Sequence, residues 1–158
     1  MFQVGDKVVY PMHGAGIIQS IEEREVLGEI RQYYVMHLPV GNMKLFVPLN
    51  SVGNLGLRDV IDQSEVQGVL AVLQSENIPT TLAWNRRYRA NLEKIKSGDI
   101  LEVADVVRSL SCREKEKGLS TGEKKMYENA CQILVSELVL AEASEEDDVR
   151  GWLNNILA

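Results

Sequence analysis

The sequence predicts an α+β fold in two domains: a small SH3- or Tudor-like antiparallel β-barrel, then an all-α domain of about five helices. Over the first 57 residues, short runs rich in β-branched and aromatic residues alternate with turn residues, as in sheets of short strands. From about residue 60 the apolar residues recur at spacings of three and four, the period of an amphipathic helix. We therefore expect domains at residues 1–57 and 58–158.

Four runs in the first half are predicted to be strands. Turn residues such as Pro11, Gly28 and Pro39 separate them, and this spacing is typical of a small antiparallel barrel. The edge strands of such a barrel suit strand addition by another protein, although blunted edges fit the sequence equally well. The four runs are Lys7–Tyr10, Ala15–Arg24, Ile30–Leu38 and Lys44–Val47.

Five amphipathic helices are expected in the second half. The first ends before Pro79 and the second stops at Ser97-Gly98, while Gly118 closes the third. Their apolar stripes are Val66, Val69, Leu70 and Leu73; Tyr88, Leu92 and Ile95; Val103, Val106, Val107 and Leu110; Met126, Ala130, Ile133, Leu134 and Leu138; and Val149, Trp152, Leu153 and Ile156.

Three of these helices have capping residues at their predicted starts. Asp99 caps the third, and Ser120 with Glu123 three residues later has the spacing of a capping box for the fourth. Ser144 is expected to cap the last helix. The acidic residues that follow it, Glu145 to Asp147, suit the positive end of the helix dipole.

Charge is unevenly distributed along the chain. The formal net charge of −6 argues weakly against a nucleic-acid partner, but residues 84–125 hold eleven basic and seven acidic side chains. Because salt screens charges beyond about 8 Å, this local excess matters more to a polyanion than the net charge does. Solvated helix faces explain the same pattern, and on pattern alone that explanation is favoured.

Several classes of function lack their signatures. No apolar run approaches the ~20 residues of a membrane span, and the first residues do not resemble a signal peptide, so we expect a cytoplasmic protein without a membrane partner. Cys112 and Cys131 form no Cys-x-x-Cys pair. Phosphate loops, nucleophile elbows and paired metal-binding histidines are absent from the sequence. We therefore expect no catalytic residues, metal, cofactor or small-molecule substrate.

The segment from Trp84 to Arg89 is the strongest candidate site. If Asn85 caps the following helix, Trp84 precedes the helix and Arg89 takes the N4 position, where a hydrophobic staple would need an apolar residue. The indole then lacks its usual local partner and projects outward, next to Arg86 and Arg87. If the helix instead begins at Thr80 or Thr81, Trp84 joins the core stripe, and the pattern alone slightly favours this second interpretation.

An exposed indole among arginines suits nucleic acid for a physical reason. Guanidinium groups bind phosphates with two parallel hydrogen bonds, while an indole stacks on a base or wedges between base steps. Arg113 and Lys124 can join this surface, because the turn at Gly118 makes the third and fourth helices antiparallel.

Seven blocks of sequence together resemble a known family. They are Val4-Gly5-Asp6-Lys7-Val8-Val9-Tyr10-Pro11 with His13-Gly14; Val47-Pro48; Trp84-Asn85-Arg86-Arg87-Tyr88-Arg89-Ala90-Asn91-Leu92; Ser97-Gly98-Asp99; Gly118-Leu119-Ser120-Thr121-Gly122-Glu123-Lys124; Gln132-Ile133-Leu134-Val135; and Glu137-Leu138. On these blocks the chain resembles, over almost its whole length, the CarD/CdnL family of bacterial RNA polymerase-binding transcription factors. Its first half also resembles the polymerase-binding module of transcription-repair coupling factors.

The resemblance implies how the protein acts. The barrel would dock on the β1 lobe of the RNA polymerase β subunit, and the helical domain would reach promoter DNA near the upstream edge of the melted bubble. There Trp84 would wedge into the minor groove and stabilise the open complex, while Arg86, Arg89, Arg113 and Lys124 would contact the DNA backbone. The protein would then associate with the nucleoid through polymerase. The alternative is an adaptor that binds polymerase or another protein without touching DNA.

The resemblance also implies polymerase-binding residues in the barrel. An arginine that the family uses against polymerase matches Arg24, and the docking region includes Phe46, Val47 and Pro48. A second family arginine falls at Phe46, which suggests a more apolar contact or a partner that has changed with it.

Overall fold

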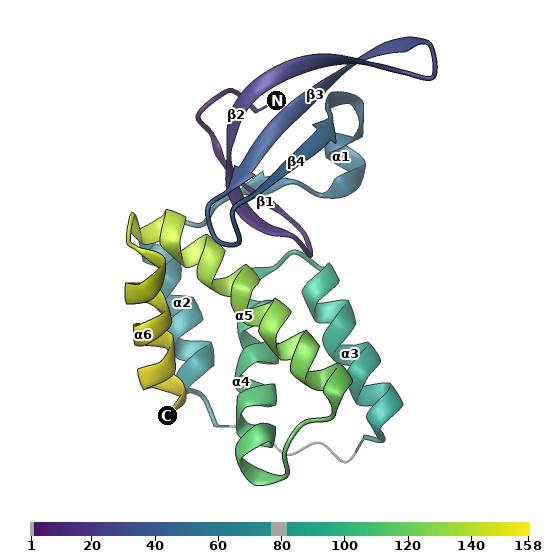
Figure 1. Ribbon diagram of the computed structural model, residues 1–158. Coiled ribbons are helices and arrows are strands. Elements are labelled where there is room, and N and C mark those ends of the chain that lie inside the picture. The colour runs from purple at the N-terminus through teal and green to yellow at the C-terminus, as the bar shows by residue number, and fades with distance from the viewer. Residues whose placement is uncertain (1, 77–81) are drawn as a thin grey trace.

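The first half of the chain forms a five-stranded antiparallel sheet in the computed structural model, which describes residues 2–76 and 82–158 (Figure 1). The strand order is β4-β3-β2-β1-β5. The predicted strands are confirmed, each within one residue at its ends except at Arg24, because the second strand continues two residues further, to Val26. The strands are β1 (Lys7–Tyr10), β2 (Gly14–Val26), β3 (Glu29–Leu38), β4 (Met43–Pro48) and β5 (Arg58–Asp59).

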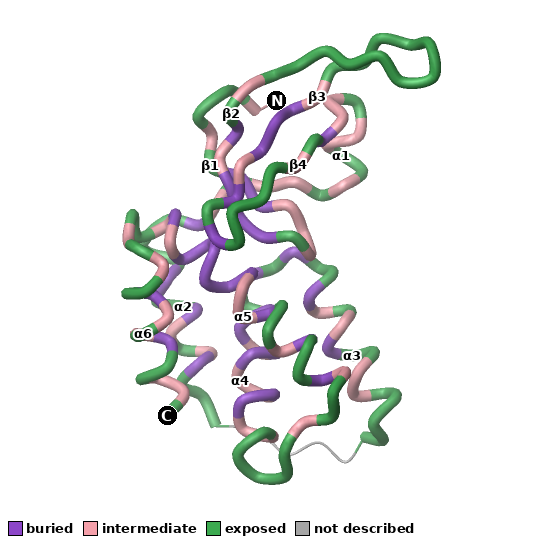
Figure 2. The backbone as a smooth tube through the Cα atoms, in the orientation of Figure 1, coloured by how far each residue is buried: buried purple, intermediate pink, exposed green. Residues whose placement is uncertain are grey.

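The base of this sheet is buried and its longest hairpin is exposed. Apolar side chains from β1 to β4 pack together with the short helix α1 (Val52–Leu55) and the preceding single turn η1 (Leu49–Ser51). The β2–β3 hairpin extends beyond this core, and residues 21–32 are all exposed (Figure 2). Its tip is Leu27-Gly28, and both residues have positive φ, the backbone that a tight two-residue hairpin turn requires.

Five helices follow among the described residues: α2 (Gln63–Gln74), α3 (Trp84–Lys96), α4 (Ile100–Glu116), α5 (Thr121–Glu142) and α6 (Glu146–Leu157). Their apolar stripes meet in one core, centred on α4 and α5 (Figure 1). The fold class is therefore confirmed: a small antiparallel β domain precedes a helical domain. No helix in residues 2–76 and 82–158 is both long enough and apolar enough to cross a bilayer.

The helix starts agree with the sequence in two of three cases. The Asp99 carboxylate accepts a hydrogen bond from the backbone N–H of Leu101 at 2.9 Å, and the Ser120 hydroxyl accepts one from that of Glu123 at 3.2 Å. The prediction for Ser144 is wrong, because Glu145 takes the N-cap position without a side-chain cap, and Ser144 donates to a carbonyl of the preceding helix instead. The acidic first turn consists of residues 146–148.

Buried polar contacts join the two domains across α5. The Arg58 guanidinium holds both oxygens of the Glu137 carboxylate at 2.7 Å, and the N–H of Ile61 donates to the same carboxylate at 3.0 Å. Near the start of β2, the N–H of Ala15 donates to the Ser136 hydroxyl at 2.8 Å. The sheet itself extends two residues past position 57, because β5 pairs with β1.

Candidate nucleic-acid interface and docking surface

Trp84 is the first residue of α3. Ala83 is the N-cap and offers no side-chain hydrogen bond, so the prediction that Asn85 caps this helix is wrong. The alternative starts at Thr80 and Thr81 lie outside the described residues. Because Trp84 occupies the first helical position, its indole lies on the same face as Tyr88, one turn later.

The indole of Trp84 is held on one side and open on the other. Its ring stacks on Tyr88 with centroids 5.0 Å apart, and its Nε1–H donates to the Ser120 hydroxyl at 3.0 Å. A Cβ atom at Gly122 would lie 3.5 Å from the indole, an ordinary packing distance, so the ring lies against the start of α5. The residue nevertheless remains 42% exposed. Neither sequence interpretation is complete, since the ring is anchored but not part of the core.

The buried carboxylate of Glu123 holds the start of α5, where Ser120 lies, against α3. Glu123 is 2% exposed and accepts hydrogen bonds from the Arg87 Nε at 3.0 Å and Nη2 at 3.3 Å. The Arg113 Nε lies 3.9 Å from the same carboxylate. The predicted capping box is thus only half formed, because the structure shows no bond from the Glu123 carboxylate back to the Ser120 N–H. Its oxygens accept hydrogen bonds from Arg87 of α3 and attract the charge of Arg113 on α4 instead.

Electrostatics keep Glu123 ionised. Burial raises the pKa of this carboxyl, but the hydrogen bonds and charge of Arg87, the charge of Arg113 and the Ser120 hydroxyl outweigh burial. The net effect is a pKa below the usual glutamate value. A negative charge at the first turn of α5 also suits the positive end of that helix.

Three exposed cationic side chains lie on the two helices that hold Trp84. Arg86 and Arg89 are exposed on α3, and Lys124 is exposed on the first turn of α5. Within the described part of the chain, none of the three forms an ion pair, so their charges are available to a polyanion. Arg113 differs from these three residues, because its side chain is only 27% exposed and its Nε lies 3.9 Å from the Glu123 carboxylate.

The barrel carries a separate exposed patch formed by Arg24 and Phe46. The Arg24 guanidinium carbon lies 4.0 Å from the centre of the Phe46 ring, and the same guanidinium pairs with Glu22 at 3.4 Å. Phe46 is 42% exposed on β4, an edge strand. Phe46, at the position of the family arginine, thus supplies the surface on which Arg24 lies.

Val47 and Pro48, the other two candidate docking residues, are less exposed than Phe46. The side chain of Val47 is fully buried in the barrel core, because successive residues of a strand point to opposite faces. The side chain of Val47 therefore anchors β4, and the part of this residue in docking stays a prediction. Pro48 is partly buried and ends that strand.

Tyr88, Arg87, Ser120 and Glu123 belong to the site, although the sequence pointed to other roles for three of them. Tyr88 fitted a core stripe, and Ser120 with Glu123 fitted a local cap. The partners in the Arg87–Glu123 and Trp84–Ser120 pairs are each 36 residues apart. Periodicity along one helix carries no signal for such contacts. Among the described residues, no cluster of three or more His, Cys, Asp or Glu side chains could hold a metal ion.

Both halves of this chain match models of known protein families. The family model described as CarD-like/TRCF RID domain matches residues 2–61, and that described as CarD, C-terminal domain matches residues 68–154. YdeB, a candidate transcription factor of Bacillus subtilis (strain 168), is 41% identical over 152 residues, which cover 96% of this chain and 99% of YdeB. The chain belongs to the CarD family.

Family membership confirms the resemblance seen in the sequence. As a CarD-family protein, the chain is a transcription regulator of the kind that binds RNA polymerase. A solved structure is also similar: the 72-residue N-terminal domain of Myxococcus xanthus CarD, determined by solution NMR. It is 30% identical, covers 37% of this chain and 79% of its own, and has a TM-score of 0.33.

Proposed function

We propose that this CarD-family protein docks on the β1 lobe of the RNA polymerase β subunit through its barrel and stabilises the promoter open complex through Trp84. The observation that carries the proposal is the indole itself, which is 42% exposed and held by Tyr88 and Ser120, on helices that also carry exposed cations. An aromatic ring that is fixed at one face and open at its edge can wedge between base steps without first losing much conformational freedom. On this proposal the protein acts in the cytoplasm, where RNA polymerase brings it to the nucleoid.

The cations around the indole hold the DNA in position. Arg86, Arg89 and Lys124 contact phosphates on either side of the wedge, and Arg113 contributes its exposed portion. About three or four phosphate contacts give a slope near −3 in a plot of log affinity against log salt, so binding to free DNA is weak. Docking on polymerase compensates, because it raises the local concentration of the helical domain at the promoter.

The wedge favours one state of the promoter over another. A ligand shifts an equilibrium only by its difference in affinity for the two states. An indole that fits only at an opened duplex junction supplies that difference, and about 1.4 kcal/mol changes the open:closed ratio tenfold. One tryptophan is therefore sufficient for the effect.

Replacement of Trp84 tests this function. We expect Trp84→Ala to shorten the open-complex lifetime about tenfold while polymerase binding is retained. The lifetime is measured by competitor challenge of preformed polymerase–promoter complexes. Leu101→Ala is the matched control, because Leu101 is 41% exposed on a different helix, and its lifetime should equal that of the wild type.

Two results would contradict the wedge. Unchanged lifetime with Trp84→Ala, together with unaltered cleavage just upstream of the bubble in a DNA footprint, would leave an adaptor that does not touch DNA. A fall in folding stability of ~3 kcal/mol or more, as a core residue would give, would show that the indole is structural.

A further inference from the structure

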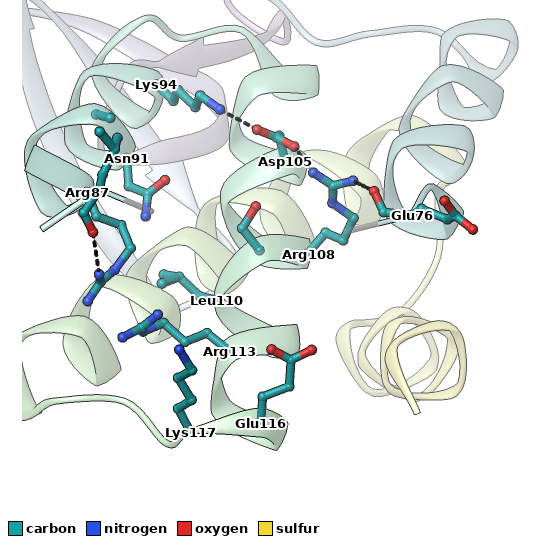
Figure 3. A pocket seen from close by; sticks show the side chains of 13 residues that line it. Glu76, Arg87, Asn91, Lys94, Asp105, Arg108, Leu110, Arg113, Glu116 and Lys117 are labelled. Carbon is teal, nitrogen blue, oxygen red and sulfur yellow. Dashed lines mark hydrogen bonds and ion pairs between the residues drawn. The ribbon is translucent and has the colours of Figure 1, made fainter. Parts of the chain in front are cut away.

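A cavity of about 270 Å³ lies on the helical domain between α3, α4 and the end of α2 (Figure 3). Five cationic side chains line it: Arg87, Lys94, Arg108, Arg113 and Lys117. Figure 3 shows Arg113 in the last turn of α4 and Lys117 at its C-cap directing their head groups toward the same side as that of Arg87. This concentration of positive charge in a hollow is not needed for the wedge.

The carboxylates near the cavity do not match these cations one to one. Asp105 is shared by Lys94 and Arg108, and Glu123 is shared by Arg87 and Arg113. In each of these two clusters, two cationic side chains therefore face a single carboxylate. Lys117 forms no ion pair within residues 2–76 and 82–158. The carboxylates of Glu76 and Glu116 also lie at the cavity, but Figure 3 shows both apart from the heads of Arg87, Arg113 and Lys117.

Two hydrogen-bond donors at this cavity are left without partners. The Nε atoms of Arg108 and Arg113 are buried, and neither makes a hydrogen bond to the described part of the chain. Arg113 Nε lies 3.9 Å from the nearest Glu123 oxygen, beyond hydrogen-bond distance. A buried unpaired N–H on a charged group is costly, so an acceptor bound at this site would be stabilising.

The floor of the cavity consists of side chains that water hardly reaches. The Arg87 side chain is 11% exposed, and Asn91, whose amide offers further donors, is 8% exposed. A recessed floor suits a small anion more than the backbone of a rigid duplex, whose phosphates lie along a convex surface. The volume is close to the lower limit of small-molecule sites, which fits a phosphate or diphosphate group.

We propose that this cavity binds the phosphate group of a small phosphorylated solute, held by Arg113 and Lys117 above Arg87 and Asn91. Phosphate oxygens accept the two-pronged hydrogen bonds that guanidinium groups offer, and the anion balances the unmatched charge of the two cation pairs. Arg113 is shared with the proposed DNA surface, whereas Lys117 belongs to this cavity alone.

The test is titration of the full chain with sodium pyrophosphate, and separately with inorganic phosphate, followed by calorimetry at low ionic strength. We expect saturable binding with one site per chain, and a shift of the Arg113 Nε–H signal in nitrogen-15 NMR spectra as it gains an acceptor. Lys117→Gln, at an exposed position, should weaken pyrophosphate binding about tenfold through loss of one charge-assisted hydrogen bond. Arg113→Gln should weaken it as well, and it leaves Arg87 to pair with Glu123.

Lys125→Gln is the matched control, because it removes the same charge from an exposed site outside the cavity. Its binding should equal that of the wild type. Absence of saturable binding, or equal weakening by Lys117→Gln and Lys125→Gln, would overturn the proposal.

A second titration separates a free solute from DNA phosphate as the source of the anion. Pyrophosphate is added to the chain already saturated with a short DNA duplex. Unchanged pyrophosphate affinity supports a site for a small solute. Competitive loss would mean that backbone phosphates occupy the cavity, and the assignment to a small solute would then be wrong.

Discussion

A single carboxylate, that of Glu123, determines how Trp84 is presented to solvent. Glu123 binds Arg87 on α3 and attracts Arg113 on α4, so the start of α5 is held against both helices. Ser120, three residues earlier, caps α5 and accepts the indole N–H. The orientation of the indole thus depends on a buried ion pair that never touches the proposed DNA partner.

Replacement of Glu123 by glutamine should be costly at neutral pH. Glu123→Gln leaves the Arg87 guanidinium, 11% exposed, without its counter-ion, and we expect a loss of about 3 kcal/mol in the free energy of unfolding. Urea denaturation at pH 7 measures this loss. Glu93→Gln, on the exposed face of α3, is the control and should be nearly neutral.

The same variant has a defined dependence on pH. Because the folded-state pKa of Glu123 lies below its ordinary value of 4.5, the stabilisation is complete above that value. It is lost as pH falls through the folded-state pKa, when the wild-type carboxylate takes up its proton. The difference between wild type and Glu123→Gln should therefore narrow as pH falls below 4.5. A constant difference across this range would mean that the charge of Glu123 is not what stabilises the fold.

At the scale of the elements, β4 and the β2–β3 hairpin form the exposed side of the barrel. β4 lies at the edge of the sheet, so its outward backbone groups have no neighbouring strand in residues 2–76 and 82–158. Arg24 reaches from β2 across β3 to Phe46 on β4, and its position over the ring keeps the charge close to this edge. Strand addition together with a cationic contact would explain docking on polymerase without a deep pocket.

Charge reversal on the hairpin tests this docking. We expect Arg24→Glu to weaken pull-down of the polymerase β subunit about tenfold, because it replaces an attractive charge with a repulsive one. Arg31→Glu is the matched control: Arg31 is 49% exposed against 52% for Arg24, and it pairs with Glu29 as Arg24 does with Glu22. Equal weakening in both variants would indicate a general charge effect, and retained binding in Arg24→Glu would show that docking uses another surface.

At the scale of the whole molecule, buried hydrogen bonds and close packing hold the two domains in contact, in addition to the covalent connection between them. Glu137 is 1% exposed and accepts three hydrogen bonds, two from Arg58 and one from the Ile61 N–H. Close packing accompanies these bonds, since a Cβ atom at Gly14 would lie 2.8 Å from the Ser136 hydroxyl. A fixed junction would hold the docking patch and Trp84 at a constant separation, as a tethered wedge requires.

Removal of Arg58 should loosen this junction. Arg58→Met leaves the buried Glu137 carboxylate without its cation, and we expect a loss of about 3 kcal/mol of stability. Spin labels at the hairpin tip and on α3 should show a broader distance distribution, and the open-complex lifetime should shorten although Trp84 and Arg24 are intact. Arg150→Met is the control, because Arg150 makes only a partly exposed pair with Glu146 within α6. An unchanged distance distribution in Arg58→Met would contradict the role of this pair in domain orientation.

The sequence by itself determined the two-domain α+β fold, the apolar faces of the helices and two of three helix caps. These features depend on residues close together along the chain, where periodicity and capping preferences operate. The choice of Trp84 with its neighbouring arginines rested on the family resemblance, because the pattern alone slightly favoured a core role, and it stays a prediction. Only the tertiary structure decided that the indole is anchored yet open, that Glu123 binds arginines instead of completing a cap, and that Val47 is buried. Arg58 and Glu137, for example, are 79 residues apart. Such contacts depend on how the helices rotate and pack against the sheet, and local sequence patterns do not predict that geometry.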